Sequence, residues 1–252
     1  MIIDADTHLS PVPEGNNSIG AEELLKRMEY AGVDKCLSWV YPPYIKTKLF
    51  DSVAYVAESM RRYPDKILGF GWIDPNLGIK SAIDLTKRCM EEYGFYGVKL
   101  NGSQNKYYVD DSEKTYPIIE EVKKAGGVVA FHTGSDDVDH VHPYRVKKVI
   151  QDFPEVKFLM IHMGGAVNRA AIETAKECPN VTLVGSEVEK PAVLRAIHEL
   201  GADRVAFGSD TPFCIMSAET AAYHAMLKEA DLSPEQIERV MYKNIAEILK
   251  LE

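Results

Sequence analysis

The sequence predicts an α/β protein that folds as a single (β/α)₈ TIM barrel with extra helices at its carboxyl end. Apolar, strand-like runs alternate with amphipathic, helix-like stretches along the chain, which indicates parallel strands joined by helices. There are eight such units, and polar residues suited to metal binding follow several of the strand-like runs. The length of 252 residues fits one barrel, so we expect one domain over residues 1–252.

Eight short apolar runs predict the strands, because runs of this length are typical of a buried parallel sheet. The predicted strands are Met1–Ala5, Lys35–Val40, Ile67–Ile73, Gly97–Leu100, Val128–Phe131, Lys157–Ile161, Val181–Val184 and Arg204–Phe207. A closed barrel is favoured over an open doubly wound sheet, since eight units fill the chain and no Gly-x-Gly-x-x-Gly follows an early strand.

Amphipathic stretches between and after the strands predict eight helices. They are Ala21–Ala31, Asp51–Arg62, Ile79–Glu92, Ser112–Ala125, Pro143–Asp152, Ala166–Glu177, Pro191–Leu200 and Ala218–Ala230. Gly32, Gly126 and Gly201 follow three of these stretches, and glycine commonly ends a helix. The last stretch, Ser233–Lys250, begins with Ser-Pro-Glu-Gln, which is typical of a helix start, and predicts one or two further helices outside the barrel.

The composition disfavours several classes of partner. A formal net charge of −9 would repel nucleic-acid phosphates, and no dense run of Lys or Arg offsets it. No apolar run approaches the length of a membrane span, and the amino terminus lacks the features of a secretion signal. We therefore expect a small-molecule substrate and neither nucleic acid nor membrane as a partner, whereas a homo-oligomer stays open.

The cysteines indicate the compartment. Cys36, Cys89, Cys178 and Cys214 are far apart and form no Cys-x-x-Cys pair, and a chain of this size needs no disulfides for stability. A reducing, cytoplasmic location fits this pattern best.

Polar residues gather at the carboxyl ends of the predicted strands, which is where barrels of this kind carry their active sites. Three of the seven histidines lie there. The strand-end segments are Asp6-Thr7-His8, Lys99-Leu100-Asn101, His132-Thr133-Gly134, His162-Met163-Gly164-Gly165 and Phe207-Gly208-Ser209-Asp210-Thr211-Pro212.

The first segment predicts a pair of metal ligands. Side chains alternate along a strand, so Asp6 and His8 point to the same side; Asp4 shares that face and is the alternative carboxylate. His132 from strand five and Asp210 from strand eight, the neighbour of strand one in a closed barrel, would complete a nitrogen and oxygen shell. We expect one divalent ion, with Zn²⁺ first and Mn²⁺ or Fe²⁺ open.

These segments, together with Gly97-Val98-Lys99-Leu100 and the closing Asn244-Ile245-Ala246-Glu247-Ile248-Leu249, resemble the amidohydrolase superfamily. Within it, the chain is similar to the amidohydrolase-related branch that includes aminocarboxymuconate semialdehyde decarboxylase. The resemblance covers nearly the whole chain and implies a catalytic TIM barrel. By this resemblance, the metal ligands would be Asp6, His8, His132 and Asp210.

The resemblance also assigns catalytic roles. Asp210 would handle the proton as well as bind the metal, and His162 would face the substrate. The family's first motif is usually His-x-His, so Asp6 is a departure that adds a negative charge and makes Mn²⁺ or Fe²⁺ more credible.

Four residues are predicted to bind substrate. His162 follows strand six, Tyr41 strand two and Glu187 strand seven. Lys99 could bind a substrate anion as a point charge. Binuclear members of the superfamily use a carboxylated lysine on strand four with a strand-six histidine, but we favour one ion because the close branch looks mononuclear.

The predicted function is metal-dependent hydrolysis. A bound metal lowers the pKa of its water to about 7, and Asp210 could accept the proton as hydroxide attacks an amide, lactone or ester carbonyl of a small carboxylated or cyclic substrate. The alternative is a non-oxidative decarboxylase in which Asp210 or His162 protonates carbon, and which needs a polar clamp such as Lys99 or Arg145. A metal-retaining binding protein is the non-enzymatic alternative.

Overall fold

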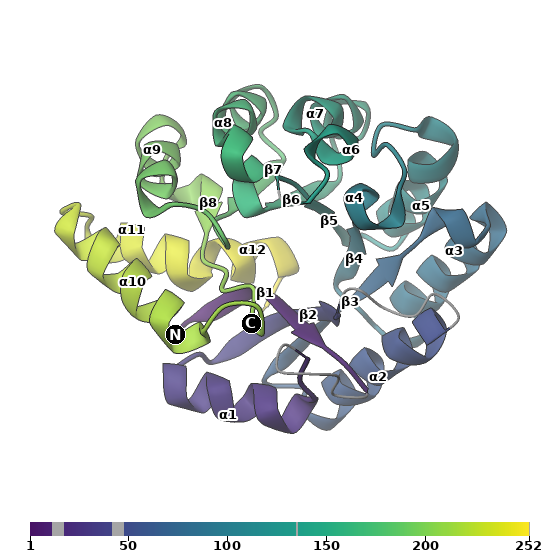
Figure 1. Cartoon of the computed structure of the whole chain (residues 1–252), viewed down its shortest axis with the longest axis horizontal. Helices are drawn as coiled ribbons and strands as arrows, with labels where there is room; N and C mark the ends of the chain where they lie inside the picture. Colours follow the sequence, from purple (N-terminus) through teal and green to yellow (C-terminus); the bar gives the residue numbers. More distant parts are fainter. Residues whose placement is uncertain (12–17, 42–47, 135, 252) are drawn as a thin grey trace.

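Eight parallel strands follow one another around the molecule in chain order (Figure 1). A computed structural model describes residues 1–11, 18–41, 48–134 and 136–251. The strands are β1 (Ile3–Leu9), β2 (Lys35–Val40), β3 (Ile67–Ile73), β4 (Gly97–Leu100), β5 (Val128–His132), β6 (Lys157–Ile161), β7 (Val181–Val184) and β8 (Val205–Ala206). Their order and parallel pairing confirm the predicted TIM barrel.

The barrel closes between β8 and β1 through backbone hydrogen bonds. Ala5 N–H donates to Phe207 O (3.1 Å), and His8 N–H donates to Thr211 O (2.8 Å). β8 is shorter than predicted because Phe207 N–H donates instead to Val240 O (2.9 Å) in the carboxyl-terminal segment. β1 is longer than predicted, since it stays paired with β2 as far as Leu9. Asp6 and His8 therefore lie within the strand and not after it.

Helices cover the outside of the barrel (Figure 1). The long ones are α1 (Ala21–Ala31), α2 (Leu49–Arg62), α3 (Ile79–Lys87), α5 (Ser112–Lys124), α7 (Pro143–Asp152), α8 (Asn168–Glu177), α9 (Lys190–Leu200) and α10 (Met216–Glu229). They match the eight predicted helices within a few residues, and the predicted end of the third forms a π-helical turn, Arg88–Glu92. Sequence reasoning missed the short helices α4 (Gly102–Asn105) and α6 (Val138–Val141).

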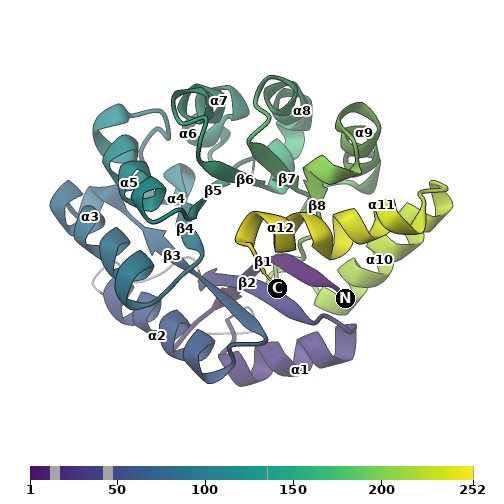
Figure 2. The ribbon, with the colours of Figure 1, turned by 180° about the vertical axis from the view of Figure 1, so that it is seen from behind.

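The carboxyl-terminal segment forms α11 (Pro234–Glu238), a π-helical turn (Arg239–Lys243) and α12 (Asn244–Leu249). Gln236 N–H donates to Ser233 Oγ (3.2 Å), and Ser233 N–H donates to Gln236 Oε1 (2.9 Å), which closes a capping box at the predicted helix start. Figure 2 shows α12 beside β1, and both β1 and β8 contact it. The predicted extra helices are confirmed.

Asn244 pins this segment to the barrel. Its buried Nδ2 donates to Ala202 O (2.7 Å) and Val205 O (2.8 Å), next to the start of β8. We expect Asn244→Ala to lower the free energy of unfolding by about 2 kcal/mol, because two buried carbonyls lose their donor. Urea unfolding measures this. The exposed control Gln236→Ala should cost about 0.5 kcal/mol, and equal losses in the two variants would contradict the pinning role.

None of the helices in the described ranges has the combined length and apolar character that a membrane crossing requires. Each of the four cysteines, all of which the structure describes, is a free thiol.

Candidate active site

A cavity of about 290 Å³ opens at the carboxyl ends of the strands. Its lining residues come from the ends of six strands, β1 and β4 to β8, and from the loops that follow them. They are His8, Asn101, Gln104, His132, Asp136, His162, Glu187, Asp210 and Phe213. Five of the eight predicted site residues are therefore brought to one cavity, namely His8, His132, His162, Glu187 and Asp210.

Three of the predicted metal ligands converge. His8 Nε2 lies 3.0 Å from Asp210 Oδ1 and 3.6 Å from Asp6 Oδ1, and the ligand atoms of all three residues lie within 4.8 Å of one another. These separations suit a single ion bound by one imidazole and two carboxylates.

The hydrogen bonds of His8 show which atom faces this cluster. Val40 O lies 2.9 Å from Nδ1 and can only accept, so Nδ1 carries the hydrogen. Nε2 is then an acceptor, and Trp39 Nε1–H donates to it (3.2 Å). A lone pair on nitrogen thus faces carboxylate oxygens, and such a cluster needs a proton or a cation at its centre. The residues fit a divalent ion.

Asp6 is held as an ionised, oriented carboxylate. Ser186 Oγ donates to Oδ2 (2.5 Å), whereas buried Oδ1 has no hydrogen-bond partner among the described residues. Lys99 Nζ lies 3.6 Å from Oδ1. Burial alone would raise the pKa of Asp6, but the charges of Lys99 and His162 lower it below its ordinary value. Oδ1 is therefore left as a negatively charged ligand atom.

Asp210 has the opposite character. Burial, and then the charge of Asp6, raises its pKa well above the ordinary value. Burial, and then the charge of Lys99, lowers the pKa of His8 to about 4. The proton between Asp210 Oδ1 and His8 Nε2, which lie 3.0 Å apart, is therefore favoured on Asp210.

This arrangement predicts coupling between metal and proton. Binding of Mn²⁺ should release about one proton, and its apparent affinity should rise roughly tenfold per pH unit until the pH exceeds the pKa of Asp210. Titration calorimetry in buffers of different ionisation enthalpy counts the proton. Asp210→Asn should abolish the release, and proton release that persists in this variant would contradict the assignment.

His132 lies in the same cavity but outside the cluster of three. Its ring is 4.7 Å from the His162 ring, edge to face, and its Nε2 lies 3.9 Å from Asp136 Oδ2. Among the described residues, the cluster of possible ligand atoms at this position consists of Asp6, His8 and Asp210. His132 as fourth ligand therefore stays a prediction.

Ser186, which sequence reasoning missed, joins two parts of the site. Besides holding Asp6, it lies next to His162, whose Nδ1 is 3.2 Å from Ser186 O and 3.0 Å from Ser186 Oγ. The carbonyl oxygen can only accept, so His162 carries its hydrogen on Nδ1. Ser186 immediately precedes Glu187, and its place after strand seven was the available signal.

Three cavity residues have left-handed backbone conformations, with φ of 64° at His162, 53° at Glu187 and 58° at Asp210. Side chains with a Cβ adopt this conformation at a cost, and it is concentrated at functional sites. Glu187 is exposed at the cavity, and it forms a second cluster with His162 and Asp210 within 4.8 Å. The left-handed backbone conformation of these three residues thus accompanies the convergence of their polar side chains in the cavity.

Two predicted substrate contacts lie elsewhere. Lys99 is fully buried, with Nζ 3.9 Å from the Trp39 ring centroid, and it does not line the cavity. This position argues against direct contact between Lys99 and the substrate. The positive charge of Lys99 acts instead on the Asp6 carboxylate. Tyr41 stacks on Phe213 with ring centroids 5.2 Å apart, so it supports the aromatic wall that Phe213 forms. Phe213 was not predicted, although it follows the Asp210 motif closely.

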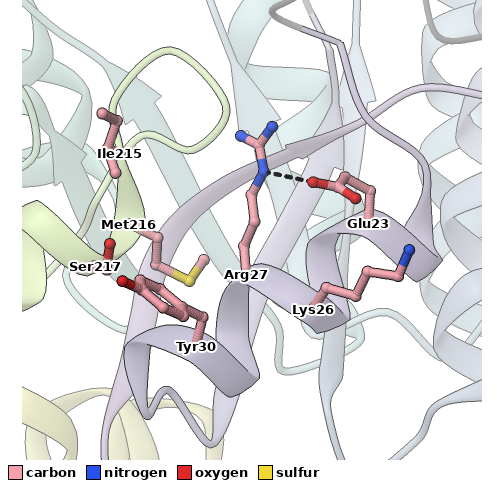
Figure 3. A pocket seen from close by; sticks show the side chains of 7 residues that line it. All are labelled: Glu23, Lys26, Arg27, Tyr30, Ile215, Met216 and Ser217. Atoms are coloured by element: carbon pink, nitrogen blue, oxygen red, sulfur yellow. Dashed lines mark hydrogen bonds and ion pairs between the residues drawn. The ribbon is translucent and has the colours of Figure 1, made fainter.

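A second hollow of about 360 Å³ lies on the outside of the barrel, between α1 and the start of α10. Figure 3 shows Tyr30 and Met216 side by side there, with the Arg27–Glu23 ion pair at one edge. None of the predicted site residues lines it. The candidate catalytic residues therefore lie in the cavity at the strand ends and not in this hollow.

A family model described as amidohydrolase matches residues 45–251. The chain belongs to the amidohydrolase family. This amidohydrolase is an enzyme. The match begins after β2, so Asp6 and His8 lie outside it. No curated protein matches the chain in sequence.

Solved structures share the fold of this amidohydrolase over nearly its whole length. A 2,6-dihydroxybenzoate decarboxylase from Rhizobium is 17% identical, with coverage of 99% of this chain and 98% of its own and a TM-score of 0.79. A 5-carboxyvanillate decarboxylase from Novosphingobium aromaticivorans, complexed with manganese and 4-hydroxy-3-methoxy-5-nitrobenzoic acid, is also 17% identical (100% and 96%, TM-score 0.79). An uncharacterised TIM-barrel protein from Bordetella bronchiseptica is 20% identical (99% and 99%, TM-score 0.81). The TM-scores and coverages establish a common fold.

Proposed function

We propose that this amidohydrolase is a metal-dependent, non-oxidative decarboxylase of an aromatic carboxylic acid. The observation that carries the proposal is one cavity that joins the buried carboxyl group of Asp210 to an aromatic wall, Phe213. The Phe213 ring lies edge to face with His8 at a centroid distance of 5.4 Å, so the wall adjoins the candidate metal ligands. The decarboxylases of aromatic acids that share the fold support the same reaction class.

In the proposed reaction, the bond between the carboxyl carbon and the ring breaks and its electron pair stays on the ring carbon. CO₂ leaves, and a proton taken up from solvent reaches that carbon through the Asp210 carboxyl group, so a carboxylate and a proton become a C–H bond and CO₂. His162, oriented by the bond from Nδ1–H to Ser186 O, accepts a hydrogen bond at Nε2 from a substrate hydroxyl group. The flat ring packs against Phe213.

One divalent ion would be held by Asp6, His8 and Asp210, with His132 as the fourth candidate. Two carboxylates make this a hard ligand set, which favours Mn²⁺ over the Zn²⁺ expected first from the sequence. The manganese bound to the 5-carboxyvanillate decarboxylase and to a dihydroxybenzoic acid decarboxylase from Polaromonas supports this choice. When bound, the ion supplies positive charge that binds substrate oxygens and stabilises the negative charge developing in the reaction.

The sequence alone places hydrolysis first, and we now reverse that order. Hydrolysis would use the same residues, with Asp210 as a base instead of an acid. The aromatic wall beside the candidate metal ligands favours decarboxylation of an aromatic acid. We also propose that residues 1–252 act as one domain, in a reducing compartment.

Assays of the Mn²⁺-loaded protein with 2,6-dihydroxybenzoate and 5-carboxyvanillate in D₂O test the proposal. We expect CO₂ release, with deuterium in the product at the carbon that lost its carboxylate. Lactones, esters and amides of aromatic acids form the comparison panel. Hydrolysis of that panel without CO₂ release from either acid would overturn the decarboxylase assignment.

A further inference from the structure

Asn101 has an amide group that no described residue satisfies. It follows β4 directly, is 1% exposed and lines the active-site cavity. Side chains two residues apart on an extended chain point the same way, so Lys99 and Asn101 both point inward. Lys99 lies deeper, beside Asp6, and Asn101 lies at the cavity.

The orientation of this amide is fixed. Asn101 Oδ1 accepts from Gln104 N–H (3.1 Å) and from Ser103 Oγ–H (3.2 Å), and so caps α4. A flipped amide would place its NH₂ group against the Gln104 N–H. Nδ2 must therefore occupy the other position, where it is buried and has no hydrogen-bond partner among the described residues.

An unpaired buried donor is costly, and native proteins keep one only where something else satisfies it. An acceptor oxygen of a ligand would do so here. We infer that the Nδ2 group of Asn101 binds the carboxylate of the substrate, an inference that rests on the proposed function.

The cations considered for binding the substrate carboxylate are held away from the cavity, which leaves this binding to a neutral donor. Lys99 does not reach the cavity, and Arg145, the other cation considered from the sequence, is engaged elsewhere: its Nη1 lies 3.3 Å from Asp110 and its Nη2 3.3 Å from Asp139. The neighbouring amide of Gln104 already donates to Asp136 Oδ2 (3.1 Å). Asn101 is thus the amide in the described lining whose hydrogens are free for a carboxylate.

Calorimetric binding of two probes to the Mn²⁺-loaded protein tests this role without turnover. The probes are 2-hydroxybenzoate and phenol, which share a ring and a hydroxyl but differ in the carboxylate. In Asn101→Ser, a capping oxygen remains and the amide donors are lost without a change of charge, so the Kd of 2-hydroxybenzoate should rise at least about tenfold while that of phenol changes less than about twofold. Asn101→Asp, which keeps the cap acceptor but adds a negative charge, serves if the serine variant fails to fold.

Ser103→Ala is the matched control. It removes a bond to Asn101 Oδ1 in the same turn but leaves the Nδ2 donors, so the Kd of 2-hydroxybenzoate should stay within about twofold of the wild-type value. An unchanged Kd for 2-hydroxybenzoate in both Asn101 variants, equal losses for the two probes, or a wild-type protein that does not bind 2-hydroxybenzoate would overturn the inference. Absence of CO₂ release alongside an Asn101-dependent Kd would instead overturn the proposed reaction only.

Discussion

Asp210→Asn is expected to lower kcat for decarboxylation by about 10³-fold, because the variant loses the carboxyl group that passes a proton to carbon. Asparagine has nearly the same shape, so the fold should persist. Steady-state CO₂ release at saturating Mn²⁺ measures the loss, and the metal content of each sample shows whether the ion is still bound.

The chain offers a matched control for this change. Asp231 also has a left-handed backbone, with φ of 52°, but is exposed and far along the chain from the strand ends. Asp231→Asn should leave kcat within about twofold of wild type. Retention of most activity in Asp210→Asn with full metal content would show that another group delivers the proton.

Gly134→Ala is expected to destabilise the protein by about 4 kcal/mol or more and to weaken Mn²⁺ binding. Gly134 has a φ of 85°, and an added Cβ would lie 1.9 Å from the backbone carbon of Gly164. The loops after β5 and β6 therefore touch backbone to backbone at this point. His132 immediately precedes the first of these loops and His162 begins the second, so separating the loops should displace both imidazoles.

Gly126→Ala separates the effect of contact from that of conformation. Gly126 also has a positive φ, 68°, but an added Cβ there would meet nothing within 4 Å. Its cost should be about 1 to 2 kcal/mol, the cost of the left-handed backbone alone, with Mn²⁺ affinity unchanged. Urea unfolding and Mn²⁺ titration compare the two variants. Equal destabilisation by both would contradict a close contact between the loops.

The sequence predicts the barrel well because its evidence is local and repeated. Apolar runs, helix-ending glycines and the Ser233 start signal each report on their own segment, and eight consistent units leave little choice of fold. His8 and Asp210 could be placed together for the same reason, since the carboxyl ends of barrel strands meet at one face.

The remaining features depend on contacts between distant segments or on backbone conformation. No local pattern shows that Lys99 is enclosed between Trp39 and Asp6 and so kept from substrate. The left-handed conformation of Glu187 and the unpaired amide of Asn101 likewise arise only in the assembled barrel. Side-chain type and position in the chain could not distinguish these roles.

We propose that Asp6, His8 and Asp210 form the metal centre of this amidohydrolase. Anomalous diffraction from crystals grown with Mn²⁺ tests it most directly, because it locates the ion independently of activity. We predict a strong peak within bonding distance of Asp6 Oδ1, His8 Nε2 and Asp210 Oδ1, and its distance to His132 decides the fourth ligand. Manganese bound elsewhere, or no peak among these three residues, would contradict the account.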